Sequence, residues 1–466
     1  MRGSSARAII GVLSEPPMFA LLDAWRHAPT QRKVWALAAP MILSNLSVPM
    51  VALVDTAVVG HLPHAHQLAA VAVGGSLYTL LTWAMGFLRM GSTGFAAQAA
   101  GRGDGGALRQ VLVQGLSLGV LLALLLSLLA LPLSNAALHL MQPSAELDAL
   151  ARQYFQIRLF GLPASLASYA LVGWLLGTQS ARGPLAILLT ANLLNVALDL
   201  LFVLGLEWGV AGAAWASVIA EWSGALLGLW LARGAIAGFP GRLDSRALRH
   251  WSSWRPLLAV NRDIFIRTLA LQLVFFLVTV QGTRLGDATV AANALLLNGL
   301  TLTAYALDGL AHAVEALCGH ALGARDRDAL RRSLLVAGAW SLLASAGFAL
   351  FFLLGGHWFV WMLTDIAEVR ELALSYLPYL ALLPLLTVWS YLLDGLFIGA
   401  TRAREMRDAM LIALALSVPL GWWLQCLGNH GLWLAFLAFM GLRSLVLAGY
   451  AWQLSRRDLW FARADR

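Results

Sequence analysis

The chain has 466 residues, of which 60% are hydrophobic and only 12% are charged. Soluble domains are about 25% charged, so this composition excludes a water-soluble protein and predicts a polytopic membrane protein. The net charge of +8 comes almost entirely from arginine. These arginines lie in short loops between apolar segments, where membrane orientation explains them better than nucleic-acid binding does. We therefore expect no nucleic-acid partner.

Residues 1–32 contain a short apolar run, Ala6–Leu13, that no convincing cleavage site follows. We interpret them as a cytoplasmic N-terminal extension and not as a cleaved signal peptide. Twelve apolar spans follow, each long enough to cross a bilayer as a helix. Their approximate limits are 34–60, 68–98, 108–133, 154–178, 184–206, 209–232, 256–283, 288–321, 332–355, 376–399, 408–428 and 431–454.

The basic residues predict the orientation of these spans. They gather in both terminal tails, in the central linker and in every second loop, whereas the opposite loops hold only Arg152, Arg284 and Arg370. Basic residues favour the cytoplasmic side, so both termini are expected to be cytoplasmic.

The chain also contains an internal duplication. A shift of 222 residues, counted from Gly101 to Gly323, aligns the loop Gly101–Asp104 with Gly323–Asp326 and continues without gaps across five spans. Each half has an even number of spans, so the repeat is parallel. The expected domains are a cytoplasmic extension (1–32), an N-lobe (33–235), a cytoplasmic linker (236–255), a C-lobe (256–455) and a cytoplasmic tail (456–466).

The fifth span carries unusual polar residues. Asn195 and Asp199 are four residues apart, so a helix places them on one face. A carboxylate in a bilayer costs about 2.5–3.5 kcal/mol, which favours a cation or proton site over a purely structural pair, particularly with a second acid at Asp55. The structural alternative is a polar contact that locks two helices together.

The depth of these residues supports one site. Asp199 and Ser217 flank the turn between spans five and six at similar distances, which places both ~13 Å below that turn at ~1.5 Å per residue. Asp55 lies near the same end of span one, and Tyr154 begins span four from that side. We therefore expect Asp55, Asn195, Asp199, Ser217 and Tyr154 to lie in the outer half of one lobe.

The second half lacks this cluster, because the shift aligns Asp55, Asn195 and Asp199 with Leu277, Ser417 and Gly421. It has its own polar residues, for which we leave an ion-pairing and a functional role equally open. Glu221, one turn beyond Ser217, is either a relay or a helix-pairing residue. The secondary candidates are Asp263, Arg267, Asp308, Glu315, Asp394 and Glu221.

Several motifs carry a family resemblance. Leu37–Leu62, with LAAPMILSN and VDTAVVGHL, the loop AAGRGD at Ala99–Asp104, and NLLNVALDLLFV at Asn192–Val203 resemble a multidrug and toxic compound extrusion (MATE) transporter. NRDIFIRTL at Asn261–Leu269 is similar to the DinF-like (DNA-damage-inducible) branch. The resemblance covers about residues 32–455. It implies an all-α, V-shaped fold of twelve transmembrane helices in two six-helix lobes.

The resemblance also implies a function and a site. Such transporters export organic, mostly cationic compounds in exchange for protons or sodium. The implied ion-coupling residues fall on Asp55, Asn195 and Asp199, with Ser217 and Tyr154 beside them. The kink-forming proline falls on Pro40, and bending at Pro40 or Pro49 is expected to follow protonation. Asp394 matches an acidic position of sodium-coupled relatives, but the seventh-helix acid of those relatives is not evident.

We expect a proton-coupled multidrug antiporter, with sodium at Asp55, Asn195, Asp199 and Ser217 as the alternative. We expect no cofactor and no other metal. The expected partners are small amphipathic or cationic molecules and membrane lipids. The protein is expected to be a monomer. The nearest alternative is a lipid-linked sugar or polysaccharide flippase of the same superfamily, against which twelve spans and the acidic cluster argue. A membrane-embedded lipid-modifying enzyme would need a nucleophile–base or metal constellation, and the sequence offers none.

Overall fold

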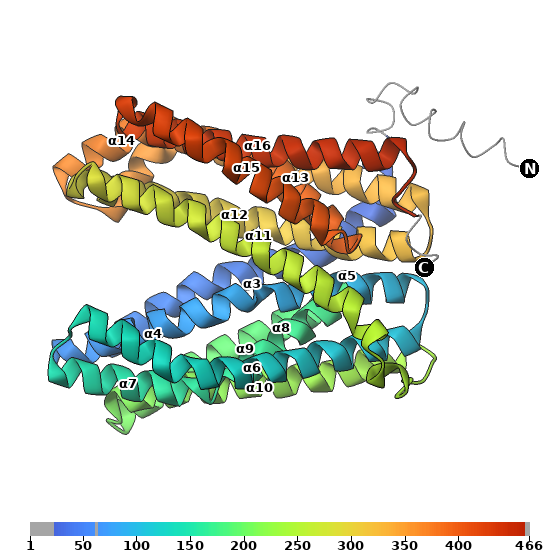
Figure 1. Ribbon diagram of the computed structural model, residues 1–466, viewed down its shortest axis with the longest axis horizontal. Helices are drawn as coiled ribbons and strands as arrows, with labels where there is room; N and C mark the ends of the chain where they lie inside the picture. Colours follow the sequence, from blue (N-terminus) through green and yellow to red (C-terminus); the bar gives the residue numbers. More distant parts are fainter. Residues whose placement is uncertain (1–22, 61–63, 462–466) are drawn as a thin grey trace, which may run out of the picture. The chain divides into compact units, whose positions relative to one another are not determined.

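The computed structural model describes residues 23–60 and 64–461, so most of the expected N-terminal extension and the last residues of the tail lie outside the described residues. The described part is built of helices and turns (Figure 1). The helices of the first half are α3 (Ala28–Gly60), α4 (Ala65–Trp83), η1 (Ala84–Gly86), α5 (Phe87–Gly101), α6 (Gly105–Met141), α7 (Ala145–Leu159), α8 (Leu162–Gly177), α9 (Arg182–Asp199), η2 (Leu200–Gly205) and α10 (Gly209–Ala237). Those of the second half are η3 (Ala247–Arg249), α11 (Trp251–Arg284), α12 (Asp287–Gly323), α13 (Arg327–Leu363), α14 (Ala367–Gly399), α15 (Ala403–Trp423), η4 (Leu424–Leu427) and α16 (Asn429–Arg456).

Every expected span coincides with a helix or a broken helix. Within the described residues, ten helices are long and apolar enough to cross a membrane, and α7 with α8, bent by 46°, adds an eleventh span. The helix α3 covers the first expected span. Large apolar side chains such as Leu121, Leu124 and Leu128 are exposed along α6, as expected for a surface that faces lipid. The prediction of an all-α polytopic membrane protein is confirmed.

Contacts divide the described chain into two units. The N-unit is Leu43–Asn261, and the C-unit combines the described parts of Met1–Ile42 and Arg262–Arg466. These limits differ from the expected lobes, because residues 33–42 pack with the C-unit and residues 236–261 with the N-unit. Two long helices, α3 and α11, therefore each belong to both units. The change of unit along α3 follows Pro40 by two residues, where the ring removes a backbone hydrogen bond from the helix.

The duplication is visible in matching local structure. Asp104 caps α6 by accepting a hydrogen bond from the Ala107 amide, and Asp326 caps α13 in the same way through Ala329, each at 2.9 Å. These two aspartates are related by the 222-residue shift, as are the left-handed residues Gly103 and Arg325 that precede them. The repeat found in the sequence therefore specifies equivalent loops and helix starts.

Small residues bring the innermost helices of each unit together. A Cβ on Gly173 of α8 would lie 2.1 Å from the Arg89 carbonyl oxygen of α5, and one on Gly177 would lie 2.7 Å from the Thr93 carbonyl oxygen. A Cβ on either of their equivalents, Gly395 and Gly399 of α14, would lie 2.6 Å from a carbonyl oxygen of α12. Such close backbone approach through small residues four positions apart is a common way to pack helices in membranes.

Candidate functional site

Two carboxyl groups meet inside the N-unit. Asp199 ends α9 and is 2% exposed, and Asp55 lies on α3 and is partly buried. Their side chains lie within hydrogen-bonding reach of each other. Two carboxyl groups can share a hydrogen bond only when one of them carries a proton, because an ionised carboxylate only accepts. One oxygen of each group, Oδ1, is buried with no hydrogen-bond partner in the described part of the chain.

The helix changes its geometry directly after Asp199. Residues Leu200–Gly205 form a π-helical turn, in which the Leu206 amide donates to the Leu201 carbonyl oxygen at 2.8 Å. Single π turns inside membrane or soluble helices are frequent at functional sites because they redirect the side chains around them. Asp199 therefore lies at the last residue of regular helix. The sequence pattern did not predict this turn.

Asn195 and Ser217 lie beside this pair, as predicted. Asn195 Nδ2 of α9 donates to Ser217 Oγ of α10 at 3.3 Å. One turn earlier, Asn192 Nδ2 donates to Ser47 Oγ of α3 at 2.8 Å. These bonds hold α9 against α10 and α3. The Asn195 amide oxygen and the Ser217 hydroxyl are thus available as oxygen ligands near the two carboxyl groups.

Tyr154 of α7 is also part of the site. It is buried, and its ring packs against Gly74 of α4, where a Cβ would lie 2.7 Å from Tyr154 Cδ1. Electrostatic interactions connect its hydroxyl group with Asp55 and Asp199. The structure therefore brings together all five residues that we expected at one site.

A buried arginine that we did not predict lies next to these residues. Arg158 follows Tyr154 by one turn of α7, and its Nη2 forms a 2.8 Å ion pair with Glu221 Oε1 of α10. Its guanidinium lies over the Tyr78 ring at 3.9 Å from the centroid. Electrostatic interactions also connect Arg158 with Asp55 and Asp199. An arginine inside an apolar span, four residues after Tyr154, was the available sequence signal.

Glu221 is therefore a helix-pairing residue with several partners. The Tyr78 hydroxyl donates to its carboxylate at 3.2 Å and contacts Ser165 Oγ of α8 at 3.1 Å. The carboxylate also lies against Gly161, at the break between α7 and α8, where a Cβ would lie 1.9 Å from Glu221 Oε2. The four residues Tyr78, Arg158, Ser165 and Glu221, which we call the bend network, join α4, α7, α8 and α10 at this break.

The acidic candidate Asp394 has a different environment in the C-unit. Asp394 Oδ2 forms ion pairs with Arg267 of α11 and Arg443 of α16. All three side chains are at least nine-tenths buried. Arg443 was not among the predicted residues, although an arginine in the middle of an apolar span was a visible signal. One carboxylate thus compensates two buried guanidinium groups, which is an ion-pairing arrangement.

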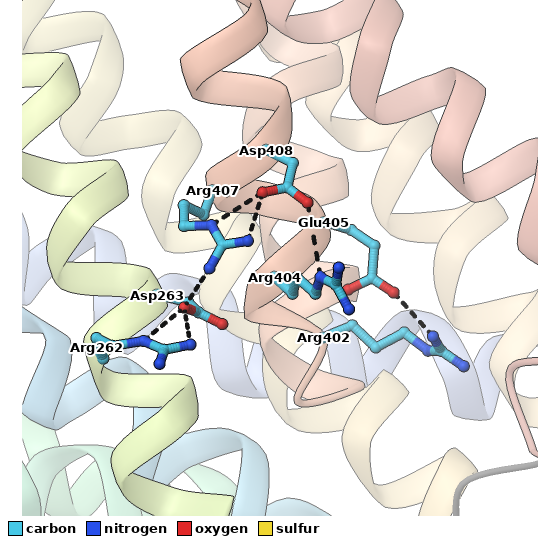
Figure 2. A network of polar contacts seen from close by, with 7 residues as sticks. All are labelled: Arg262, Asp263, Arg402, Arg404, Glu405, Arg407 and Asp408. Atoms are coloured by element: carbon cyan, nitrogen blue, oxygen red, sulfur yellow. Dashed lines mark hydrogen bonds and ion pairs between the residues drawn. The ribbon is translucent and has the colours of Figure 1, made fainter.

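Asp263 belongs to a second ionic network, shown in Figure 2. Its Oδ1 accepts from Arg262 and from Arg407 of α15, each at 2.8 Å. Arg407 also pairs with Asp408 at 2.6 Å. The network continues at the start of α15 with the pairs Arg404–Asp408 and Arg402–Glu405. Asp263 therefore connects α11 with α15.

The two remaining acidic candidates lie on α12. Asp308 interacts electrostatically with Arg267 and with the hydroxyl group of Tyr391. Glu315 is buried, and its backbone lies against Gly399 of α14. Both acids make polar interactions. The two prolines of the first span, Pro40 and Pro49, lie on α3, Pro40 before and Pro49 after its change of unit.

The N-unit and the C-unit thus differ in chemistry. Among residues 23–60 and 64–461, no group of three or more His, Cys, Asp and Glu side chains is arranged to hold a metal ion. The N-unit has two carboxyl groups that face each other with free oxygen atoms. In the C-unit, the buried acid Asp394 lies between two arginines.

Comparisons with known proteins agree over nearly the whole chain. A family model described as MatE matches residues 40–201 and again residues 264–423. The chain is 44% identical over 435 residues to the DNA damage-inducible protein F of Escherichia coli (strain K12), covering 93% of this chain and 94% of that protein. It is 26% identical over 432 residues to the multidrug resistance protein PmpM of Pseudomonas aeruginosa, covering 86% of this chain and 87% of that protein.

A solved structure has the same fold. It is described as the outward-facing conformation of a multidrug resistance MATE family transporter of the MOP superfamily. The TM-score is 0.81 at 20% sequence identity, and the match covers 93% of this chain and 96% of that chain. The family model matches once in each half, in agreement with the duplication seen in the sequence and in the helices.

Proposed function

Because the chain belongs to the MatE family, we propose that it is a secondary active multidrug antiporter that exports organic, mostly cationic compounds in exchange for protons. Its function is transport and not enzyme catalysis. Its location is the bacterial inner membrane, with both termini in the cytoplasm, and it works as a monomer among membrane lipids.

The observation that carries this proposal is the pair of carboxyl groups at Asp55 and Asp199. Intramembrane carboxyl groups are expensive, and a pair that retains free oxygen atoms is not fully compensated by its surroundings. Such a pair can take up a second proton or a cation, and each of these removes negative charge from a buried place. Competition between a proton and an organic cation for the same carboxylates is the chemical basis of antiport. Asn195, Ser217 and Tyr154 orient and solvate the pair.

The membrane potential supplies part of the driving force. At 100 mV, one elementary charge that crosses the membrane is worth about 2.3 kcal/mol. If two protons enter for one monovalent cation exported, one net charge moves inward with the potential. Protonation of the pair also removes charge next to the part of α3 that contains Pro49, where the helix lacks one backbone hydrogen bond and bends most easily.

Protons suit this site better than sodium. Sodium prefers several hard oxygen ligands, and the N-unit could supply them from Asp55, Asp199, Asn195 and Ser217. Asp394, whose position matches an acid of sodium-coupled relatives, forms ion pairs with two arginines. Two positive charges beside one carboxylate oppose the binding of a third cation. A proton needs only one carboxyl group, and Asp55 with Asp199 provides that.

The experiment is efflux of ethidium, a dye cation, from proteoliposomes that contain the full-length protein. An imposed pH gradient without sodium is expected to drive efflux, and Asp55→Asn is expected to abolish it while insertion and folding remain normal. Asp365→Asn is the matched control, because Asp365 is fully exposed in the turn between α13 and α14 and pairs with Arg370. Efflux by a folded Asp55→Asn protein at the native rate contradicts the proposal.

A further inference from the structure

The bend network contains hydrogen-bond donors that no neighbour uses. Arg158 is nine-tenths buried, yet among the described residues only its Nη2 group makes a hydrogen bond, in the ion pair with Glu221. Its Nε and Nη1 groups are buried with no hydrogen-bond partner in the described part of the chain. A buried guanidinium normally uses most of its five N–H groups, so two free nitrogen atoms require an explanation.

The neighbouring carboxyl pair has oxygen atoms that accept no hydrogen bond in the described part of the chain. Asp55 Oδ1 and Asp199 Oδ1 are buried without a donor, and both groups interact electrostatically with Arg158. Arg158 and Tyr154 lie one turn apart on the same face of α7, and the Tyr154 hydroxyl interacts with both acids as well. Free donors and free acceptors therefore lie on adjoining sides of one buried polar cluster.

Glu221 does not depend on Arg158 alone. The Tyr78 hydroxyl donates to either of its oxygen atoms at 3.2 Å, and Gly161 leaves room for the carboxylate at the break between α7 and α8. Glu221 would keep these contacts if the guanidinium turned away. The arrangement therefore gives Arg158 two alternative acidic partners, Glu221 and the carboxyl pair.

We propose that Arg158 is an internal counter-ion that turns from Glu221 to the Asp55–Asp199 pair when the pair loses its proton, and returns when a proton or a cationic substrate occupies the pair. This inference rests on the proposed proton-coupled function. Arg158 is thus a positioning residue: it keeps the empty, ionised site from carrying two uncompensated charges. It also links the charge of the pair to the break between α7 and α8, because the same guanidinium belongs to the bend network.

The choice of partner by Arg158 depends on the charged and titratable groups that face this cluster. The carboxyl pair faces Arg158 and Tyr154 of α7, and it comes from α3 and α9. Arg158 faces Tyr78 of α4 and Glu221 of α10, and Glu221 also faces Tyr169 of α8. Tyrosines stay neutral near pH 7. The groups whose charges decide this choice are therefore Asp55, Asp199, Glu221 and Arg158.

The test is ethidium binding to the purified full-length protein as a function of pH. Arg158→Met removes the counter-ion, so the pair keeps its proton to higher pH and the binding midpoint moves alkaline by about 1–3 pH units. Glu221→Gln removes the competing acid, so the midpoint moves to lower pH. Arg158→Lys keeps a positive charge and restores most of the native profile.

A double variant separates a counter-ion from a purely structural ion pair. In Arg158→Met with Glu221→Gln, both charges of the bend network are absent and no unpaired charge remains there. An alkaline shift of about one pH unit or more in this variant supports the exchange, because the carboxyl pair has still lost its counter-ion. A native midpoint in the double variant, or shifts of the two single variants in the same direction, overturns it.

Failure of this inference can be distinguished from failure of the proposed function. If Asp55→Asn leaves the pH dependence of ethidium binding unchanged, the carboxyl pair is not the coupling site. If Asp55→Asn removes that dependence while the Arg158 variants keep the native midpoint, the site stands and only the counter-ion role is refuted.

Discussion

The change Asp394→Asn tests whether the acid of the C-unit is structural. Asp394 compensates both Arg267 and Arg443, and all three side chains are at least nine-tenths buried. The asparagine has nearly the same shape but no charge, so two guanidinium groups are left without their shared counter-ion. The nearby acid Asp308 interacts electrostatically with Arg267 and compensates part of its charge when Asp394 is replaced.

The expected loss of stability is large. Removal of one partner from a buried ion pair costs about 3–5 kcal/mol, because a buried charge remains uncompensated. For a unit of 150–250 residues, each kcal/mol lowers Tm by about 2–4 °C, which predicts a decrease of about 6–20 °C. By contrast, Asp199→Asn removes one of two adjacent carboxyl groups. We expect it to leave Tm unchanged, because the asparagine amide can donate to Asp55 in place of the shared proton.

The assay is thermal unfolding of the purified protein, followed by the fluorescence of its 19 tryptophans, beside ethidium efflux at a temperature where each variant is folded. Asp394→Asn should lower Tm and keep pH-driven efflux, whereas Asp199→Asn should keep Tm and lose efflux. Asp365→Asn, at a fully exposed acid, should change neither. If Asp394→Asn keeps the native Tm and loses efflux, the coupling acid lies in the second half and our reasoning is refuted.

The remaining predictions concern the bend, the network of Figure 2 and the coupling ion. Gly161→Ala should lower the free energy of unfolding by about 1–3 kcal/mol, because its Cβ would lie 1.9 Å from Glu221 Oε2. Gly86→Ala is the control and should leave it unchanged, because no atom lies within 4 Å of its Cβ. Unfolding in denaturant compares the two variants. Asp263→Asn should lower Tm by less than half as much as Asp394→Asn, because Arg407 keeps Asp408 and Arg262 is 63% exposed. Efflux should follow a pH gradient without sodium, and a sodium gradient at matched pH should drive little. Efflux on sodium alone, indifferent to pH, would overturn proton coupling and leave the assignment of the Asp55–Asp199 site standing.

Much of the candidate site was predictable because its signals are local. Asn195 and Asp199 lie four residues apart in an apolar span, which places them on one helix face in any packing. The hairpin between α9 and α10 then fixes Ser217 at the same depth as Asp199. In the structure Asn195 Nδ2 donates to Ser217 Oγ at 3.3 Å, so Ser217 meets the residue one turn before Asp199 on the same face of α9.

The residues that we missed depend on contacts between distant segments. Arg158 was identifiable as a buried arginine, but its partner Glu221 lies 63 positions further along the chain. Arg443 meets Asp394 across 49 positions, and Arg267 meets it across 127. Spacing along one helix carries no information about which helices become neighbours, so these ion pairs could not be assigned from the sequence.

The sequence by itself determined the membrane class, the approximate positions of the spans and the duplication, because each follows from apolar length and from repeated residues along the chain. Tertiary structure alone decided that α3 changes unit after Ile42, that α9 ends in a π turn at Asp199, and that one buried acid meets another acid while a second meets two arginines. The physical reason is the low dielectric of a membrane interior. There the state of an ionisable group is set by the charges within a few ångströms of it, and packing chooses those neighbours.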